Sequence, residues 1–326
     1  MKTTKVIGTG LYVPEKVITN FDLEKMVDTT DEWIVTRTGI KERRFAADNE
    51  ATSDLGAEAA RRALDDAKIN SSEIDMVILA TATPDMMFPA TACLVQHKLG
   101  IKRAAAFDLE AACSGFLYGL SIADTYIKSG VYETILVIGT ETFSRIIDPQ
   151  DRNTCVLLGD GAGAAVLREG EDGHRILCNY LSADGSNADL LKVPAGGSRL
   201  PANQQTVEQR LHYMKMNGKE TYRFAARLMV EAVTIALAKS ELSEKDIDLL
   251  IPHQANIRIL KSVAKKLSLP MENIMVNLDK YGNTSAASIP IALDEAIKQG
   301  KIDDGDIVVL TAFGSGLTWG ATVIKW

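Results

Sequence analysis

The sequence feature that most constrains the fold is an internal repeat, because the second part of the chain resembles the first. The matching pairs of segments are Ala67-Lys68 with Ala238-Lys239, Tyr126–Gly130 with Ala296–Gly300, and Ile135–Ile138 with Ile307–Leu310. Position 68 thus corresponds to 239, 128 to 298 and 135 to 307, and the separation is about 170 residues in each case. A nearly constant separation across three elements predicts two similar halves, residues 1–171 and 172–326.

Short apolar runs alternate with longer amphipathic segments in both halves. The apolar runs are typical of strands buried on both faces, and they are Met76–Ala80, Ile135–Gly139, Leu249–Ile251 and Ile307–Leu310. The expected helices are Ser53–Lys68, Ser114–Lys128, Lys219–Lys239, Ile257–Leu267 and Ser285–Lys298. This alternation predicts an α/β fold whose largely parallel sheets are covered by helices.

The repeat also aligns two turns that precede predicted helices. Phe107–Leu109 followed by Cys113 aligns with Asn277–Asp279 followed by Asn283, and we expect a strand, a small-residue turn and a helix start in both. Halves that pack about a pseudo-twofold axis would bring these two helix N-termini face to face. Residues 182–218 have no counterpart of similar length, and their Gly and Pro residues predict either a wall over a site or only a variable loop.

Charge and cysteine content exclude several classes of function. With 36 basic and 43 acidic residues the net charge is −7, which disfavours nucleic acid or an anionic membrane as a partner, although a local basic patch stays possible. The four cysteines lack the spacing of a metal site, and their low density disfavours a disulfide framework. No secretory segment and no apolar run of ~18 residues is evident. We expect a cytoplasmic protein without metal.

Three residues are candidates for chemistry, each with a structural alternative. Cys113 lies between a predicted strand and a predicted helix, where the helix N-terminus would lower the pKa of its thiol; the alternative is a small buried thiol. His253 follows a buried strand, where ligands meet an α/β sheet, or it is a hydrogen-bonded structural histidine. Asn283 is either a turn residue that caps a helix or a polar group opposite Cys113.

Two glycine clusters and one basic stripe complete the candidates. Gly159–Ala164 runs into a strand-like segment instead of opening a helix, so we reject a dinucleotide-binding loop. Phe313–Gly316 either presents a backbone N–H to an oxyanion or is a tight turn. Arg258, Lys261 and Lys265 share one face of a predicted helix; the stripe is either a solvated face or a site for an acidic macromolecule.

Six motifs in the same order and spacing resemble the β-ketoacyl-[acyl-carrier-protein] synthase III family of the thiolase superfamily. The motifs are Asp31–Ile40, Ala112–Phe116, Gly159–Ala164, His253–Asn256, Gly282–Ser285 and Gly316–Gly320. The resemblance covers essentially the whole chain. It implies a thiolase-like five-layer αβαβα fold made of two pseudo-symmetric halves, and a homodimer.

The resemblance also implies the roles of individual residues. It makes Cys113, His253 and Asn283 a catalytic triad, and it places the backbone N–H groups of Cys113 and Ser315 in an oxyanion hole. Phe88 would line the partner subunit's acyl pocket. The implied coenzyme A contacts are Thr29, Trp33, Arg37, Arg152 and Asn256, and the implied carrier-protein contacts are Gln254, Ala255, Asn256, Ile257 and Arg258. No cofactor would be bound permanently, because the coenzyme A thioester is a substrate.

The implied reaction is a decarboxylative Claisen condensation that starts type II fatty-acid synthesis. Cys113 takes an acyl group from an acyl-CoA, and malonyl-acyl-carrier protein then loses CO₂ and attacks it, giving 3-oxoacyl-acyl-carrier protein and CoA. Decarboxylation supplies the carbanion, so no carboxylate base is required and we identify none near the motifs. The alternatives are a Cys-His acyl-CoA hydrolase, a polyketide starter enzyme and a catalytically silent carrier-protein binding module. Pocket shape, which the sequence does not give, decides the primer.

Overall fold

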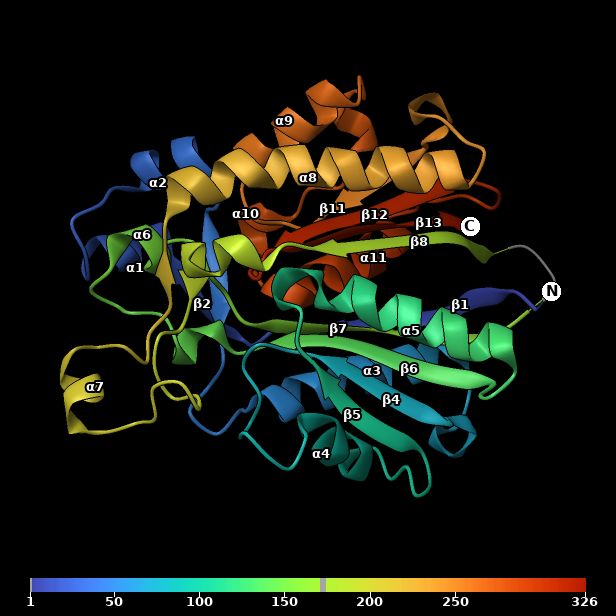
Figure 1. The fold of residues 1–326 in the computed structure, drawn as a ribbon, viewed down its shortest axis with the longest axis horizontal. Helices are drawn as coiled ribbons and strands as arrows, with labels where there is room; N and C mark the ends of the chain where they lie inside the picture. The colour runs from blue at the N-terminus through green and yellow to red at the C-terminus, as the bar shows by residue number, and fades with distance from the viewer. Residues whose placement is uncertain (1, 171–173) are drawn as a thin grey trace.

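Two mixed β-sheets form the centre of the computed structural model, which describes residues 2–170 and 174–326 (Figure 1). The first sheet has the strand order β1 (Thr4–Tyr12), β7 (Gly161–Glu169), β6 (Thr134–Glu141), β4 (Met76–Ala80) and β5 (Ala105–Leu109). The second has the order β11 (Leu249–Pro252), β12 (Ile307–Gly314), β13 (Thr318–Lys325) and β8 (Arg175–Ala183). The predicted boundary between residues 171 and 172 lies outside the described residues and stays a prediction.

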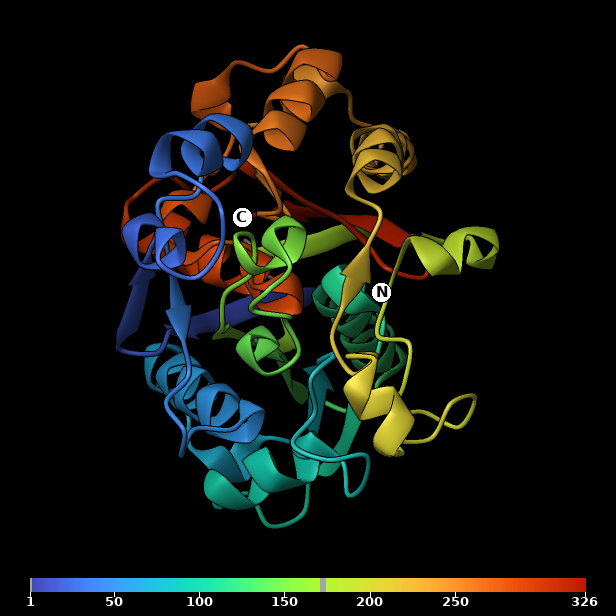
Figure 2. The same ribbon diagram turned by 90° about the vertical axis from the view of Figure 1, so that its left-hand side faces the viewer.

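Helices form three layers around these sheets (Figures 1 and 2). α3 (Thr52–Ala67) and α4 (Thr91–Lys98) cover the outer face of the first sheet, and α8 (Gly218–Lys239) and α9 (Ile257–Lys266) cover that of the second. α5 (Gly115–Ser129) and α11 (Ser288–Lys298) lie between the sheets and contact both. The order of layers is therefore helix, sheet, helix, sheet, helix.

Smaller elements gather at one end of these layers. They are α1 (Asn20–Glu24), α2 (Asp31–Thr38), α6 (Arg152–Cys155), α7 (Gln204–Glu208), α10 (Leu278–Tyr281), the pair β2 (Lys16–Thr19) with β3 (Glu42–Phe45), and the pair β9 (Leu191–Lys192) with β10 (Lys215–Met216). The predicted loop at 182–218 thus contains a short helix and a two-stranded ribbon. No helix in the described part of the chain is long and apolar enough to cross a membrane.

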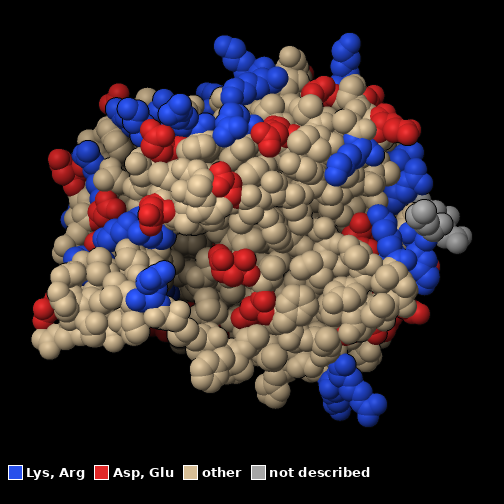
Figure 3. Space-filling model, viewed as in Figure 1, with Lys and Arg blue, Asp and Glu red and all other residues tan. Residues whose placement is uncertain are grey.

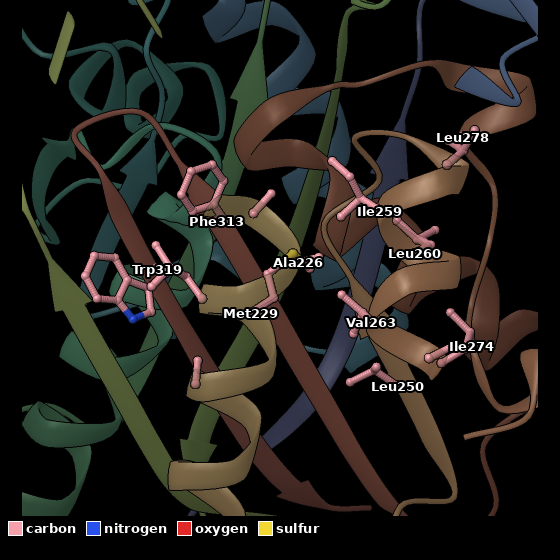
Figure 4. Packing of buried hydrophobic residues seen from close by; sticks show 14 of the residues in the cluster. Ala226, Met229, Leu250, Ile259, Leu260, Val263, Ile274, Leu278, Phe313 and Trp319 are labelled. Atoms are coloured by element: carbon pink, nitrogen blue, oxygen red, sulfur yellow. The ribbon is translucent and has the colours of Figure 1, made fainter. Parts of the chain in front are cut away.

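The outer helices of the second half pack on their sheet through one amphipathic face (Figure 4). In α9 the residues Ile259, Leu260 and Val263 are buried, because apolar side chains recur every three or four positions. They join Ala226 and Met229 of α8 in one core cluster. The opposite face of α9 stays in solvent, and it carries the basic residues that the sequence predicts there.

Two expectations from the sequence are wrong. The sheets are mixed, because β7 and β13 run antiparallel to both of their neighbours. β12 and β13 are joined by a turn at 315–317, and so short a connection joins only antiparallel strands. The segment Asn277–Asp279 is not a strand: the chain leaves the second sheet after a single bridge at Ile274 and forms α10.

The matched turns of the two halves lie against each other. They are the 3₁₀ turns η2 (Ala112–Ser114) and η7 (Ser285–Ala287), which directly precede α5 and α11 and are in contact. Both begin with a left-handed residue, Ala112 at φ 46° and Ser285 at φ 50°. Since these two residues correspond, the structural counterpart of Cys113 is Ala286, and Asn283 lies just before the matched turn.

Glycine in β6 permits this close approach. A Cβ atom on Gly139 would lie 2.3 Å from the backbone oxygen of Ala286 in η7. Real Cβ atoms do not come so near to backbone oxygens, so any larger residue at position 139 would push η7 away from the first sheet.

We therefore predict that Gly139→Ala lowers the free energy of unfolding by about 1–3 kcal/mol through overpacking. Gly197→Ala is the matched control, because a Cβ there meets nothing within 4 Å. Urea unfolding of both variants measures the difference. A Gly139→Ala protein as stable as Gly197→Ala would contradict the tight contact.

Candidate active site

Cys113 is at the centre of η2, between the end of β5 and the start of α5. Its side chain is almost wholly buried, with 9% of its surface exposed. Burial is the main reason why the pKa of the thiol is raised to about 12; the Ser285 hydroxyl lowers this pKa, and the nearby charge of Glu141 makes a smaller contribution that raises it. The prediction that a helix N-terminus would lower this pKa is wrong, because desolvation outweighs the other effects.

His253 directly follows β11, and its ring is fixed from the neighbouring helix α11. Its Nδ1 lies 2.7 Å from the Oγ of Ser288, and its backbone N–H donates to the oxygen of Thr311 at 2.8 Å. The Ser288 Oγ also accepts a long hydrogen bond, 3.5 Å, from the backbone N–H of Gln254. If the Ser288 hydroxyl donates to Nδ1, the ring proton of the neutral imidazole is on Nε2, and this is the tautomer that the reaction proposed below uses.

Burial also controls the charge of this imidazole. His253 has 3% of its surface exposed, and burial lowers the pKa of its ring to about 4. The ring is therefore neutral near pH 7 and acts there as a hydrogen-bond donor through Nε2 rather than as a cation.

Asn283 is fixed by hydrogen bonds of its backbone and by a hydrogen bond to its side-chain oxygen. Its backbone N–H donates to Leu157 at 2.8 Å, and its backbone oxygen accepts from Gly159 at 3.0 Å. The side-chain Oδ1 accepts from the backbone N–H of Ser285 at 2.8 Å. Since Oδ1 has this partner, and Nδ2 has none among the described residues, the amide N–H₂ is available to a bound molecule.

The end of β12 passes over the backbone of Cys113. A Cβ on Gly314 would lie 2.8 Å from the Cys113 nitrogen, so only glycine leaves this N–H open. The hydroxyl of Thr318 donates to the oxygen of Ala111 at 2.9 Å, which ties the same turn to β13. Ser315, the predicted second oxyanion donor, directly follows Gly314, and its hydroxyl donates to the oxygen of Leu191.

Cys113, His253 and Asn283 line one cavity of about 850 Å³. Leu191 and Met216 of the β9–β10 ribbon also line it, so the segment predicted as a wall or a variable loop forms part of a wall. A long, largely apolar cavity with a thiol, an imidazole and an amide suits a flexible chain that ends in a reactive carbonyl.

The cavity extends to an aromatic and cationic cluster on α2 and α6. The guanidinium carbons of Arg37 and Arg152 lie 5.2 and 5.0 Å from the centroid of the Trp33 ring. Trp33, Arg37 and Asn256 line the cavity. Thr29 does not appear in its lining; its hydroxyl is buried without a hydrogen-bond partner among the described residues.

The predicted carrier-protein segment divides into a buried and an exposed part. Gln254 has 1% of its surface exposed, and its amide bonds the backbone of Pro252, Met275 and Asn277. Its side chain therefore supports the site from inside and does not belong to a docking surface. Ala255, Asn256 and Ile257 are half-buried, and Arg258 is exposed.

Several exposed Lys and Arg side chains lie along the edge of the molecule that α2, α8 and α9 form, and others lie elsewhere on the same face (Figures 1 and 3). Arg258 lies over the ring of Tyr222, a residue of the cavity lining, with 5.4 Å from its guanidinium carbon to the ring centroid. Lys261 and Lys265 continue the exposed face of α9. Phe88 is far more exposed, at 85%, and lies beside Met87 at 81%; neither lines the cavity.

Sequence reasoning missed Glu141, Ser285 and Ser288. Contrary to the expectation of no carboxylate near the motifs, the buried Glu141 lies near enough to Cys113 for its charge to raise the pKa of the thiol. Glu141 lies at the carboxyl end of β6, and in a parallel sheet this end is where polar groups meet a ligand. The sequence therefore contained a signal that could have identified Glu141 as a site residue. Ser288 had no comparable signal in the sequence.

Comparisons with known proteins agree with this geometry. Two family models match, 3-oxoacyl-[acyl-carrier-protein] synthase III over residues 107–185 and the C-terminal part of the same family over residues 237–326. The beta-ketoacyl-[acyl-carrier-protein] synthase III of Caldanaerobacter subterraneus is 57% identical over 321 residues, which are 98% of this chain and 97% of that protein.

Solved structures are similar over the whole chain. The 3-oxoacyl-[acyl-carrier-protein] synthase III of Aquifex aeolicus is 50% identical with a TM-score of 0.92, and the match covers 99% of this chain and 100% of that one. A priming β-ketosynthase of the R1128 polyketide pathway is 35% identical with a TM-score of 0.91, covering 99% and 96%. The predicted thiolase-like fold is thereby confirmed.

Proposed function

The chain belongs to the β-ketoacyl-[acyl-carrier-protein] synthase III family of acyltransferases, and we propose that it condenses an acyl-CoA primer with malonyl-acyl-carrier protein. The products are 3-oxoacyl-acyl-carrier protein, CoA and CO₂, and the reaction initiates type II fatty-acid synthesis. The observation that carries the proposal is one cavity whose lining includes Cys113, His253 and Asn283 together with Trp33 and Arg37, with the guanidinium of Arg152 over the Trp33 ring.

In the first half-reaction the sulfur of Cys113 attacks the thioester carbonyl of acyl-CoA. The carbonyl oxygen becomes negative, and the open N–H of Cys113 together with the N–H of Ser315 would stabilise it. The CoA sulfur leaves as a thiolate and takes up a proton, while Cys113 has lost one, so protons balance. The product is an acyl-Cys113 thioester, which separates acyl transfer from carbon–carbon bond formation.

In the second half-reaction malonyl-acyl-carrier protein replaces CoA. The C–C bond to its carboxylate breaks, CO₂ leaves, and negative charge develops on the thioester oxygen. The Nε2–H of His253 and the free amide of Asn283 would both donate to that oxygen. A neutral imidazole suits this role, because it donates a hydrogen bond without giving up its proton to the enolate. The carbanion then attacks acyl-Cys113 and releases the sulfur.

The residues around Trp33 suit a stacking contact with coenzyme A. The guanidinium groups of Arg37 and Arg152 lie over the ring of Trp33, and such a stack of planar groups with positive charge suits the purine and the phosphates of coenzyme A. The amide of Asn256 donates to the backbone oxygen of Arg37 at 3.1 Å and so joins α2 to the start of α9. Thr29 comes directly before Thr30, the N-cap of α2. It would therefore act on coenzyme A through the position of that helix.

Two substitutions separate the half-reactions. We predict that Cys113→Ser loses acyl transfer from acyl-CoA, whereas Asn283→Ala still forms the acyl-enzyme but releases CO₂ from malonyl-acyl-carrier protein about 100–1000-fold more slowly. Intact-protein mass spectrometry follows the acyl group, and trapped CO₂ measures decarboxylation.

Cys93→Ser is the matched control, because Cys93 does not line the cavity. A Cys113→Ser protein that is acylated at the normal rate, or an Asn283→Ala protein with normal CO₂ release, would contradict the assigned roles. Running the first assay on a mixture of acyl-CoA primers also ranks the primers.

The exposed basic face of α9 supports a docking role for the acidic carrier protein. Arg258, at the mouth of the cavity, and Lys261, one turn further, would attract that partner while its prosthetic arm enters the cavity. Ala255, Asn256 and Ile257 would form the less charged part of the same surface.

We predict that Arg258→Glu with Lys261→Glu raises the KM for malonyl-acyl-carrier protein about fivefold or more at low salt and leaves acylation by acyl-CoA unchanged. The effect should shrink at high salt, because exposed charges are screened. Lys102→Glu is the control, an exposed lysine distant in sequence from α9. Steady-state kinetics measure the KM for malonyl-acyl-carrier protein. An unchanged KM would mean that the basic residues of α9 form only a solvated face.

We also propose that two copies of the chain associate through the loop that follows β4. Met87 and Phe88 are more than four-fifths exposed, and large apolar side chains rarely stay so exposed unless a partner covers them. In the dimer that the family implies, Phe88 would reach the acyl pocket of the partner subunit.

Phe88→Ser with Met87→Ser should therefore weaken self-association by at least about tenfold, which sedimentation at several concentrations would measure. Val207→Ser is the control, because Val207 is also exposed, at 62%, but lies on α7. A native chain that sediments as a monomer would overturn the proposed association.

The alternative functions make different predictions in the same assays. A Cys-His acyl-CoA hydrolase would release CoA continuously without malonyl-acyl-carrier protein and would form no carbon–carbon bond. The likeness to the polyketide priming enzyme keeps a starter role open, because fold and identity at 35% do not specify the acyl chain. The choice of primer separates that role from fatty-acid initiation.

A further inference from the structure

A buried carboxyl group lies behind Cys113, and the reaction derived above does not use it. Glu141, the last residue of β6, has no exposed surface. Its carboxyl group accepts hydrogen bonds from the hydroxyls of Thr81 and Thr83, at 3.1 and 2.7 Å, and from the backbone N–H of Ala82, at 3.1 Å. A charged group in the core normally has a cation beside it, but in the described part of the chain no salt bridge reaches Glu141.

The hydroxyl of Ser285 connects this carboxyl group with the nucleophile. Its presence lowers the pKa of both Glu141 and the Cys113 thiol, which places it near each of these two groups. It is buried, and none of the described residues gives it a hydrogen bond of regular geometry. A buried hydroxyl without a fixed partner is free to rotate, so it can donate its proton to either neighbour.

Among the groups around this cluster, His253 shares the cavity with Cys113 and is neutral near pH 7. The contributions from the loop after β4 and from α3 are the hydroxyls of Thr81, Thr83 and Thr52, and η7 contributes Ser285. The thiol of Cys113 in η2 titrates, and Glu110, which precedes η2 and is exposed, adds a weaker negative charge to the surroundings of Cys113. Cys113 and Glu141 are therefore two acids that share one niche without a cation between them.

We propose that Glu141 is a positioning residue for the condensation, whose proton state, relayed by the Ser285 hydroxyl, sets how readily Cys113 forms the attacking thiolate. With Glu141 ionised, Ser285 donates to the carboxylate and its oxygen accepts the S–H of Cys113, which holds the thiol in its protonated form. With Glu141 neutral, Ser285 is released and donates to the sulfur anion. The inference rests on the proposed role of Cys113 as the nucleophile.

The direction in which the thiolate fraction of Cys113 depends on pH follows from the pKa values of Glu141 and Cys113. Burial raises the pKa of Glu141 to about 7, against lowering by its hydroxyl and amide partners, so its charge changes near neutral pH. Above that pH the carboxylate adds a second negative charge next to the sulfur and raises the pKa of Cys113. The thiolate fraction then increases with pH less steeply than that of an isolated cysteine.

The experiment measures alkylation of Cys113 by iodoacetamide, a neutral probe, as a function of pH. Peptide mass spectrometry separates Cys113 from the three other cysteines. We compare the wild-type enzyme with Glu141→Gln, which keeps the shape and removes the charge. The ratio of the variant rate to the wild-type rate should rise about tenfold between about pH 6 and about pH 9, one pKa unit of coupling between like charges.

Two controls separate the relay from other effects. Glu110→Gln removes a carboxylate that also acts on Cys113 but is exposed, and its rate ratio should stay flat. Ser285→Ala removes the relay, so adding Glu141→Gln to it should change the pH dependence less than in the wild-type background. A structural defect alone would lower the rate by the same factor at every pH.

Each outcome decides the proposal. A ratio that is constant across the pH range, or one that rises equally in Glu110→Gln, overturns it. If Glu141→Gln does not fold, the wild-type profile decides: a bend near pH 7 that Ser285→Ala weakens supports the relay, and a straight line overturns it. Failure of the proposed function is distinguishable, because Cys113 would then be alkylated by iodoacetamide yet not acylated by acyl-CoA.

Discussion

The contact between the two 3₁₀ turns, η2 and η7, is the constraint on which the rest of the site depends. It requires small residues on every surface that meets there. A Cβ on Gly115 would come within 2.9 Å of the Cβ of Ala80, and one on Gly163 within 2.7 Å of the backbone of Ile291. These glycines let α5 lie against β4 and α11 lie against β7. Because the turns then meet at the carboxyl ends of β4, β6, β11 and β12, groups far apart in sequence reach one cavity.

Burial at this contact decides what kind of chemistry the site supports. It raises the pKa of Cys113 and Glu141 and lowers that of His253, so each of the three groups is driven toward its neutral form. A site without fixed charges stabilises a developing enolate by oriented donors instead of by a cation. It also holds its nucleophile protonated until a substrate arrives, so the environment of the sulfur and not its intrinsic acidity controls the first step. The positively charged residues of the cavity lining are Arg37, Lys219 and Arg258.

The sequence predicts the duplicated architecture well, because apolar runs and a constant repeat report directly on burial. Met76–Ala80 is a strand with the predicted bounds, and Ile257–Leu267 differs from α9 only at its last position. Strands such as β1 and β8 escaped notice because their alternation is broken by glycine and polar residues. The direction of the pKa shift at Cys113 could also not be predicted from the sequence. It depends first on burial, and the smaller contributions of Ser285 and Glu141 come from segments that approach Cys113 only through packing.

The duplication explains why the two halves carry different groups at equivalent places. The alignment that pairs η2 with η7 also pairs Glu141, at the end of β6, with Gly314, at the end of β12. Each strand end faces the turn of the opposite half, β6 against η7 and β12 against η2. Gly314 leaves the N–H of Cys113 open to a substrate oxygen, whereas Glu141 fills the equivalent niche beside Ser285. One niche therefore has room for a reacting carbonyl and the other does not. The pseudo-symmetric scaffold therefore has one site for two reasons: Cys113 has Ala286 as its counterpart, and the side chains at the two strand ends differ in volume.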